Sequence, residues 1–221
     1  MKKLAIELGQ TLVAYLILCA ALFGMGSTII QYIGFDSHAA FLAQKQDYIT
    51  IKPWRFAFYI HAFTCVFCLF AGFTQFSSFL LKEHRALHRL MGRLYAITIL
   101  IINFPVALIM AYYANGLIPS RIAFFILDVL WFTFTLKAVI AIRKKDVKSH
   151  REWMIRSFAL TFSAITNRTW KLVLAHYLPI DNLSLYMLDA WLGFVPNILV
   201  AELIIRFTRK PSSTQAKLHN H

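Results

Sequence analysis

The sequence predicts an all-α, polytopic membrane protein, a bundle of six transmembrane helices with both chain ends in the cytoplasm. Hydrophobic residues make up 59% of the 221-residue chain, and a mean hydropathy of +0.60 is too high for a domain that folds in water. Six stretches of roughly 20 or more apolar residues can each cross a hydrocarbon layer of about 30 Å. Basic residues cluster between alternate stretches, which predicts the side of the membrane on which each connection lies.

The predicted spans run, in chain order, over about 11–33, 54–80, 90–113, 121–142, 153–177 and 183–207. The first follows two lysines, as a signal peptide would, but its apolar run is too long and no small-residue cleavage site closes it. Pro105 and Pro196 are expected to kink the third and sixth spans. Residues 1–210 therefore form one predicted transmembrane domain. Residues 211–221 have no apolar face and are predicted to be a disordered cytoplasmic tail.

Three parts of the chain are strongly basic and are therefore expected in the cytoplasm. They contain Lys82, Arg85, Arg89 and Arg93, then Arg143, Lys144, Lys145, Lys148 and Arg151, and finally Arg206, Arg209 and Lys210. The connections 114–120 and 178–182 carry almost no charge and 34–53 is nearly balanced, so these are predicted to face outward. The net charge of +13 thus indicates topology rather than a nucleic-acid partner. We expect a multi-pass protein of the cytoplasmic membrane, in contact with the lipid bilayer and with anionic headgroups at its inner face.

Ionisable and polar residues inside the spans are costly to bury, so they are the candidate functional residues. They fall into two layers. The cytoplasmic layer contains Gln75, His84, His88, Arg89, Arg93, Lys137, His150, Glu152, Arg156, Asn197 and Glu202. The outer layer contains His61, Asp128, Asn167, Arg168, Lys171, His176 and Asp189. His61 and Gln75 are nearly four turns apart, so one helix face is expected to carry both layers.

Each of these groups also has a structural interpretation. Arginines near a boundary can reach the lipid headgroups, Glu152 is spaced to pair with Arg156, and Glu202 can pair with a nearby arginine. Asp128 and Arg168 would form an ordinary ion-pair lock between two helices. A neutral His61 can bond inside the bundle. The CxxC motif of Cys65 and Cys68 has aromatic neighbours, which favours small buried hydrophobes over redox chemistry.

Several of these residues occur in motifs. His88-Arg89 is followed by Gly92-Arg93-Leu94-Tyr95, and His150-Arg151-Glu152-Trp153-Met154 is followed by Arg156-Ser157. Together with His61, Gly72, Gln75, Trp131, Arg168, Asn197 and Glu202, these motifs resemble an uncharacterised bacterial family of integral membrane proteins, domain of unknown function 2306, over roughly residues 54–206. The resemblance implies a membrane location and singles out His61, His88, Arg93, His150 and Arg156. It implies no activity.

The first functional hypothesis is a b-type haem or quinone-linked electron-transfer protein. His61, His88 and His150 are its candidate haem-iron ligands, and Arg93, Arg156 and Arg168 would pair with the haem propionates. The remaining polar residues would form a structural network, comprising Gln75, Asp128, Asn197 and Glu202.

Two other hypotheses stay open, and the sequence assigns no catalytic residue. One is a transporter of protons or small solutes that uses His61, Asp128, Arg168 and Glu202 as relays. Apart from the two proline positions, the sequence shows no pair of broken helices to support it. The other is a non-catalytic partner of another membrane protein, such as an assembly factor or sensor, whose basic layer binds lipid or a neighbouring subunit. Whether the protein is an enzyme is left undecided.

Overall fold

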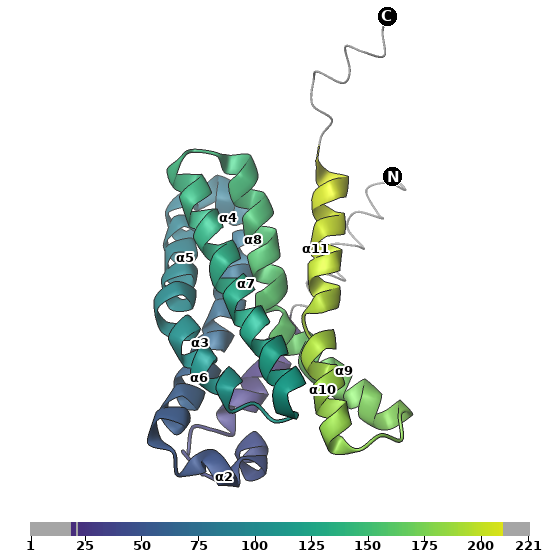
Figure 1. The fold of residues 1–221 in the computed structure, drawn as a ribbon. Helices are drawn as coiled ribbons and strands as arrows, with labels where there is room; N and C mark the ends of the chain where they lie inside the picture. Colours follow the sequence, from purple (N-terminus) through teal and green to yellow (C-terminus); the bar gives the residue numbers. More distant parts are fainter. Residues whose placement is uncertain (1–18, 21, 210–221) are drawn as a thin grey trace, which may run out of the picture.

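A computed structural model describes residues 19–20 and 22–209, and these residues form helices and connections without a β-strand. Residues 22–30 are helical. The elements that follow are η1 (Ala40–Gln44), α2 (Gln46–Ile49), α3 (Lys52–Gln75), α4 (Ser78–Glu83), α5 (Arg85–Ile97), η2 (Thr98–Asn103), α6 (Phe104–Tyr112), α7 (Leu117–Arg143), α8 (Val147–Thr161), α9 (Ser163–Tyr177), α10 (Asn182–Leu192) and α11 (Val195–Thr208). A bundle of α3, α5–α6, α7 and α8 forms the centre, and α9, α10 and α11 lie to one side of it (Figure 1).

Four helical stretches in the described residues are long and apolar enough to cross a membrane: Lys52–Gln75, Arg85–Tyr112, Leu117–Arg143 and Asn182–Thr208. They correspond to the second, third, fourth and sixth predicted spans. An all-α membrane fold is therefore confirmed, while the count of six and the orientation remain predictions. The second span ends at Gln75 rather than at residue 80, because the chain breaks at Phe76 before the short helix α4. Residues 11–18 of the first span and the predicted tail 211–221 lie outside the described residues.

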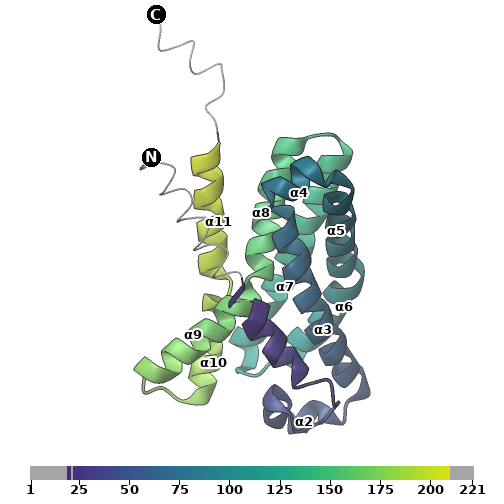
Figure 2. The same ribbon diagram turned by 180° about the vertical axis from the view of Figure 1, so that it is seen from behind.

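The fifth predicted span, 153–177, is broken rather than continuous. Helix α8 ends at Thr161, and α9 begins at Ser163 and turns away to lie beside α10 (Figure 2). The Ser163 hydroxyl donates to the Leu160 carbonyl at 2.5 Å, and the Thr166 hydroxyl donates to the Gly193 carbonyl at 2.5 Å. The first bond is local to the break, and the second holds the start of α9 at the junction of α10 and α11.

The sixth predicted span is also interrupted. Helix α10 ends at Leu192 and α11 begins at Val195, with Pro196 in its first turn. Proline suits the first turn of a helix because it has no backbone N–H to donate. Two helix breaks, at Phe162 and at Gly193, are thus tied to each other by the Thr166 bond.

The third predicted span bends through a π-helix, Thr98–Asn103, two residues before Pro105. Such segments are rare and recur at functional sites. The side chain of Asn103 is fully buried, and its amide oxygen accepts from Thr64 at 3.0 Å. The π-helix therefore aims a polar side chain at α3 in the middle of an otherwise apolar contact.

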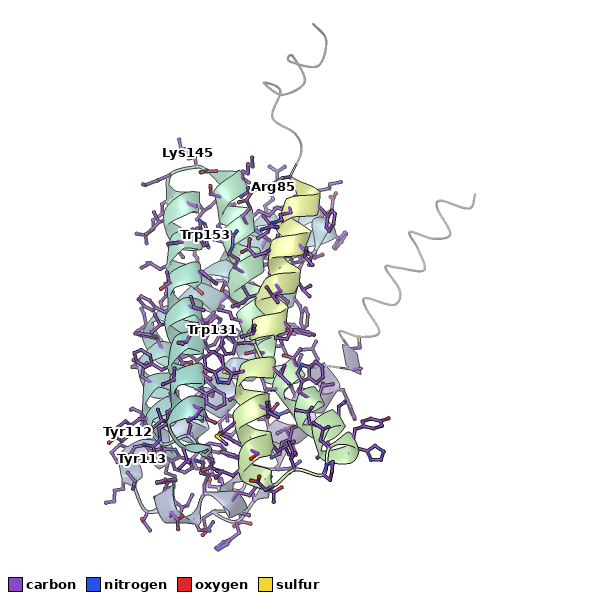
Figure 3. The ribbon with its side chains drawn as sticks, turned by 45° about the vertical axis from the view of Figure 1, so that its right-hand side comes forward. Arg85, Tyr112, Tyr113, Trp131, Lys145 and Trp153 are labelled. Atoms are coloured by element: carbon purple, nitrogen blue, oxygen red, sulfur yellow. The ribbon has the colours of Figure 1, made fainter. Side chains whose placement is uncertain are left out.

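The basic connections gather at one end of the molecule. Arg85, the first residue of α5, and Lys145, between α7 and α8, lie at this end, and Tyr112 and Tyr113 at the end of α6 lie at the other (Figure 3). Asp146 begins α8 by accepting from the Ser149 N–H at 3.0 Å. We call the two ends the basic end and the cap end, because η1 and α2 cover the second one (Figure 1).

Candidate functional site

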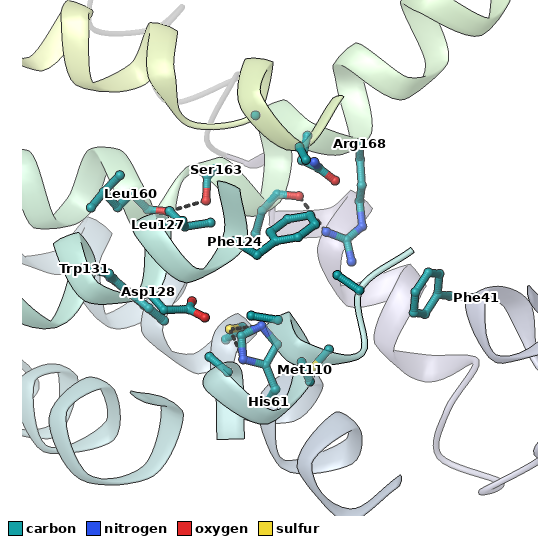
Figure 4. A pocket seen from close by; sticks show the side chains of 18 of the residues that line it. Phe41, His61, Met110, Phe124, Leu127, Asp128, Trp131, Leu160, Ser163 and Arg168 are labelled. Carbon is teal, nitrogen blue, oxygen red and sulfur yellow. Dashed lines mark hydrogen bonds between the residues drawn. The ribbon is translucent and has the colours of Figure 1, made fainter. Parts of the chain in front are cut away.

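A cavity of about 200 Å³ lies between the central bundle and the two helix breaks. Its apolar walls include Phe124, Leu127, Trp131 and Leu160. Ser163 and Gly193, at the two breaks, also line it. Its charged and polar lining includes Lys45, His61, Asp128, Asn167 and Arg168. The cavity thus brings together His61, Asp128 and Arg168, the three outer-layer residues of the transporter hypothesis (Figure 4).

His61 enters the cavity from α3. Its Nε2 atom lies 3.3 Å from the sulfur of Cys65, one turn further along the same helix. Cys65 in turn contacts the amide oxygen of Asn103 at 3.8 Å. The imidazole is therefore held on the cavity wall by a soft, weakly polar neighbour rather than by a carboxylate.

Asp128 enters from α7 and is 7% exposed. Among the described residues it has neither a hydrogen-bond partner nor an ion-pair partner, and its carboxyl group points into the cavity (Figure 4). The ion pair between Asp128 and Arg168 that the sequence suggested does not form. A buried carboxyl group without a partner is unusual in a folded protein. The Asp128 carboxyl group can therefore be satisfied only by a molecule in the cavity.

Arg168 reaches the cavity from α9, in the space between Phe124 and Phe41 (Figure 4). Its Nη1 atom donates to the carbonyl of Ala164 at 2.6 Å, one turn earlier. Its other guanidinium nitrogens make no hydrogen bond within the described part of the chain. Asp189 on α10 lies within electrostatic range of Arg168, but it does not line the cavity, and one of its carboxyl oxygens is buried without a partner.

Lys45 closes the cavity from the cap end and is 2% exposed. Its Nζ atom donates to the Tyr113 carbonyl and to Asn115 Oδ1, both at 2.6 Å, and lies 4.8 Å from the centre of the Tyr48 ring. Burial, together with the positive charge of Arg121, lowers the pKa of Lys45 to about 8. Lys45 therefore links the cap, η1 and α2, to the residues that follow α6 through both hydrogen bonds.

A fully buried network of hydroxyl groups lies on the wall of the cavity that faces the basic end. Trp131 Nε1 donates to Thr161 Oγ1 at 2.9 Å, and both residues line the cavity. Tyr95 Oη lies 2.7 Å from Thr161 Oγ1 and 2.8 Å from Ser157 Oγ, which is 2.7 Å from Thr135 Oγ1. Thr135 donates to the Trp131 carbonyl at 2.7 Å. Each hydroxyl can thus accept one bond and donate one, so the network is satisfied without water.

The cytoplasmic layer lies elsewhere. Gln75 Nε2 donates to the His88 carbonyl at 3.3 Å, and Gln75 is roughly 21 Å along α3 from His61 at about 1.5 Å per residue. His88 and His150 approach each other within electrostatic range from α5 and α8. His150 Nδ1 donates to the Ala138 carbonyl at 2.9 Å, whereas His88 Nδ1 is buried without a partner.

The remaining candidates divide between ion pairs and helix contacts. Arg156 donates to Glu202 through Nε at 2.5 Å and Nη2 at 2.9 Å, which joins α8 to α11. Glu152 pairs with Arg209 at 2.8 Å and not with Arg156, so the expected i,i+4 pair is wrong. Asn197 donates to the Ala159 and Gly193 carbonyls and to Thr166 Oγ1 at the helix breaks. Arg93 is exposed, and among the described residues it has no hydrogen bond from its side chain.

Sequence reasoning missed three parts of this site. Lys45 appeared to be a loop charge, because only the folded cap buries it. Asn103 is fully buried. The available signal in the sequence was a polar residue inside an apolar span. The third is the break between α8 and α9, which the polar side chains of Ser163 and Thr166 mark but over which hydropathy averages.

Comparison with protein families gives one result for this chain. The model of a family described as "Predicted membrane protein (DUF2306)" matches residues 58–205, more than half of the 221 residues. The match includes His61, Asp128 and Arg168 and excludes Lys45. Searches of curated proteins and of solved structures found no match.

Proposed function

The chain belongs to this family of membrane proteins, and because the family's description names no activity, we propose a function from the cavity of this chain. The protein binds a small polar solute in the cavity and moves it across the membrane. It is thus a solute transporter of the cytoplasmic membrane, with the cavity on the outer half of the bilayer.

The observation that carries the proposal is the carboxyl group of Asp128, which has no partner among the described residues and faces a cavity bounded by two broken helices. An ionisable group inside a membrane costs several kcal/mol unless it is paired or hydrated. The substrate sites of transporters commonly lie where helices are discontinuous, because the unpaired backbone groups and the helix ends bind the substrate there. The breaks at Phe162 and Gly193 supply such a place, with Ser163 and Gly193 on the cavity wall.

Charge distribution supports the orientation. The basic end carries the arginines and lysines of α4 and α5, of the connection between α7 and α8, and of the end of α11, so it faces the cytoplasm and the anionic lipid headgroups there. The cap end then faces outward. With the predicted first span, 11–33, and the broken pair α8–α9 as two further crossings, the proposed topology has six spans and both ends inside.

Flux across a membrane tests the proposal. The full chain is reconstituted in phospholipid vesicles, and uptake of labelled alanine, propionate, ethylamine and glycerol is followed with and without a pH gradient. We expect protein-dependent uptake of at least one solute, reduced about tenfold or more by Asp128→Asn. His38→Ala, at a side chain 73% exposed on the cap end, should leave uptake unchanged. Absence of uptake of all four solutes by folded protein would contradict the proposal.

A second candidate is a haem site at the basic end, and one observation favours it. The Ala138 carbonyl holds Nδ1 of His150 as the donor, which leaves Nε2 free, the arrangement that metal-binding histidines usually show. His88 faces it from α5. The residues around His61 do not fit haem, because no second histidine of the described ranges lines that cavity and about 200 Å³ is below the roughly 300–1,000 Å³ of typical ligand pockets. Arg156 is already bound to Glu202 and is not free for a propionate.

Absorption spectra decide this second candidate. The purified protein, produced with ample haem precursor, is measured oxidised and reduced, beside His88→Ala, His150→Ala and His61→Ala. A haem held at the basic end predicts a Soret band that fades in the first two variants and persists in the third. A colourless, well-folded wild type would remove this candidate and leave the transporter proposal intact.

A further inference from the structure

We infer that the cavity takes a small zwitterion, a molecule with one carboxylate, one protonated amine and a short apolar body. This inference names the substrate class of the proposed transporter and rests on that function. It concerns Asp128, Arg168 and the apolar walls between them.

The negative side of the site is Asp128. Asp128 as a whole residue is 7% exposed, and the residues that the structure describes offer its carboxyl group no donor. In a region of low dielectric, a bound ammonium group supplies both the missing charge and the missing hydrogen bonds. A ligand without such a donor leaves the carboxyl group unsatisfied.

The positive side is Arg168. Within the described part of the chain only Nη1 is hydrogen-bonded, to the Ala164 carbonyl, so the guanidinium still has N–H groups to bind a carboxylate, for which its planar shape is well suited. Lys45 does not compete for the ligand, because its ammonium group already binds the Tyr113 carbonyl and Asn115. The cavity therefore offers one cation and one anion from opposite helices, α9 and α7.

Separation and size complete the argument. Asp128 and Arg168 line one cavity without approaching within ion-pair distance, so a molecule of about 200 Å³ or less can lie between them. The walls contributed by Phe124, Leu127 and Leu160 suit a short apolar group. A ligand with only a carboxylate would satisfy Arg168 but add a second negative charge near Asp128. A ligand with only an amine would satisfy Asp128 but add a second positive charge near Arg168.

Equilibrium binding tests the inference on the full chain in detergent. Alanine and leucine are titrated as zwitterions, with propionate, ethylamine and propionamide as probes that lack one or both charges, and Trp131 fluorescence or calorimetry is the readout. We expect the zwitterions to bind about tenfold or more tightly than the other three. Asp128→Asn should remove the preference of alanine over propionate, and Arg168→Gln the preference of alanine over ethylamine. His38→Ala should keep both preferences.

The outcomes separate this inference from the transporter proposal. Equal binding of propionate and alanine, or binding of none of the five by folded protein, overturns the inference. Zwitterion binding that responds to both variants but produces no flux in vesicles supports the inference and overturns transport. Flux of propionate or glycerol without zwitterion binding supports transport and overturns the inference.

Discussion

The phenol oxygen of Tyr95 on α5 lies 2.8 Å from the hydroxyl of Ser157 on α8, and both residues are fully buried. Tyr95 also bonds Thr161, which accepts from Trp131 on α7. One tyrosine thus connects three helices and forms part of the wall between the cavity and the histidines of the basic end. The predictions below begin with this contact.

Tyr95→Phe should lower the free energy of unfolding by about 1–3 kcal/mol, because it leaves the Ser157 and Thr161 hydroxyls buried with one partner fewer. The measurement is an SDS-induced unfolding curve in mixed micelles. Tyr112→Phe removes a hydroxyl from a tyrosine that is 66% exposed and should change stability by less than about 0.5 kcal/mol. Equal effects of the two substitutions would contradict a structural role for the network.

Gly72→Ala should destabilise the bundle by about 1–3 kcal/mol, because the added Cβ would lie 2.5 Å from ring atoms of Phe158 and 3.2 Å from Tyr95. Gly26→Ala is the matched control, since no atom of the residues described in the structure lies within 4 Å of the Cβ it adds. The control should be neutral or slightly stabilising, as alanine is the better helix former. Thermal unfolding of the two variants in the same detergent gives the comparison, and a neutral Gly72→Ala would show that α3 and α8 are not in close contact.

The Arg156–Glu202 pair should couple more strongly than the Glu152–Arg209 pair. The arginine side chain is 12% exposed in the first pair and 53% exposed in the second. Double-mutant cycles with glutamine substitutions should yield about 1–3 kcal/mol for the first and less than about 1 kcal/mol for the second. The reverse order would mean that α11 is not anchored to α8 through Glu202.

The Glu152–Arg209 pair should contribute a small pH dependence. The hydrogen bond from Arg209 holds the pKa of Glu152 below its ordinary range, so the native state binds fewer protons there than the unfolded state. The stabilisation is then fully present above the ordinary pKa of about 4.3 and is lost as the pH falls through the native value. The difference in unfolding free energy between the wild type and Glu152→Gln should therefore shrink between pH 6 and about pH 3. A constant difference would show that the pair does not form.

The amino-acid sequence by itself determined the fold class, the spans at 90–113 and 121–142, and the family. Transfer of a side chain into lipid is a local property that adds along the chain, and cytoplasmic retention of arginine and lysine depends on counts in each connection. The fixed rise of a helix is enough to place His61 and Gln75 at different depths on α3.

Only the tertiary structure decided which groups of equal depth meet. Arg156 binds Glu202 and not Glu152, and Asp128 faces Arg168 across a cavity instead of pairing with it. These outcomes depend on how far each helix rotates about its axis and on where the chain bends, at Phe162 and at Gly193. Both are set by the packing of side chains from distant segments, such as Thr166 against the Gly193 carbonyl. Hydropathy and helical spacing contain no information on such contacts, because neither describes the neighbour across the bundle.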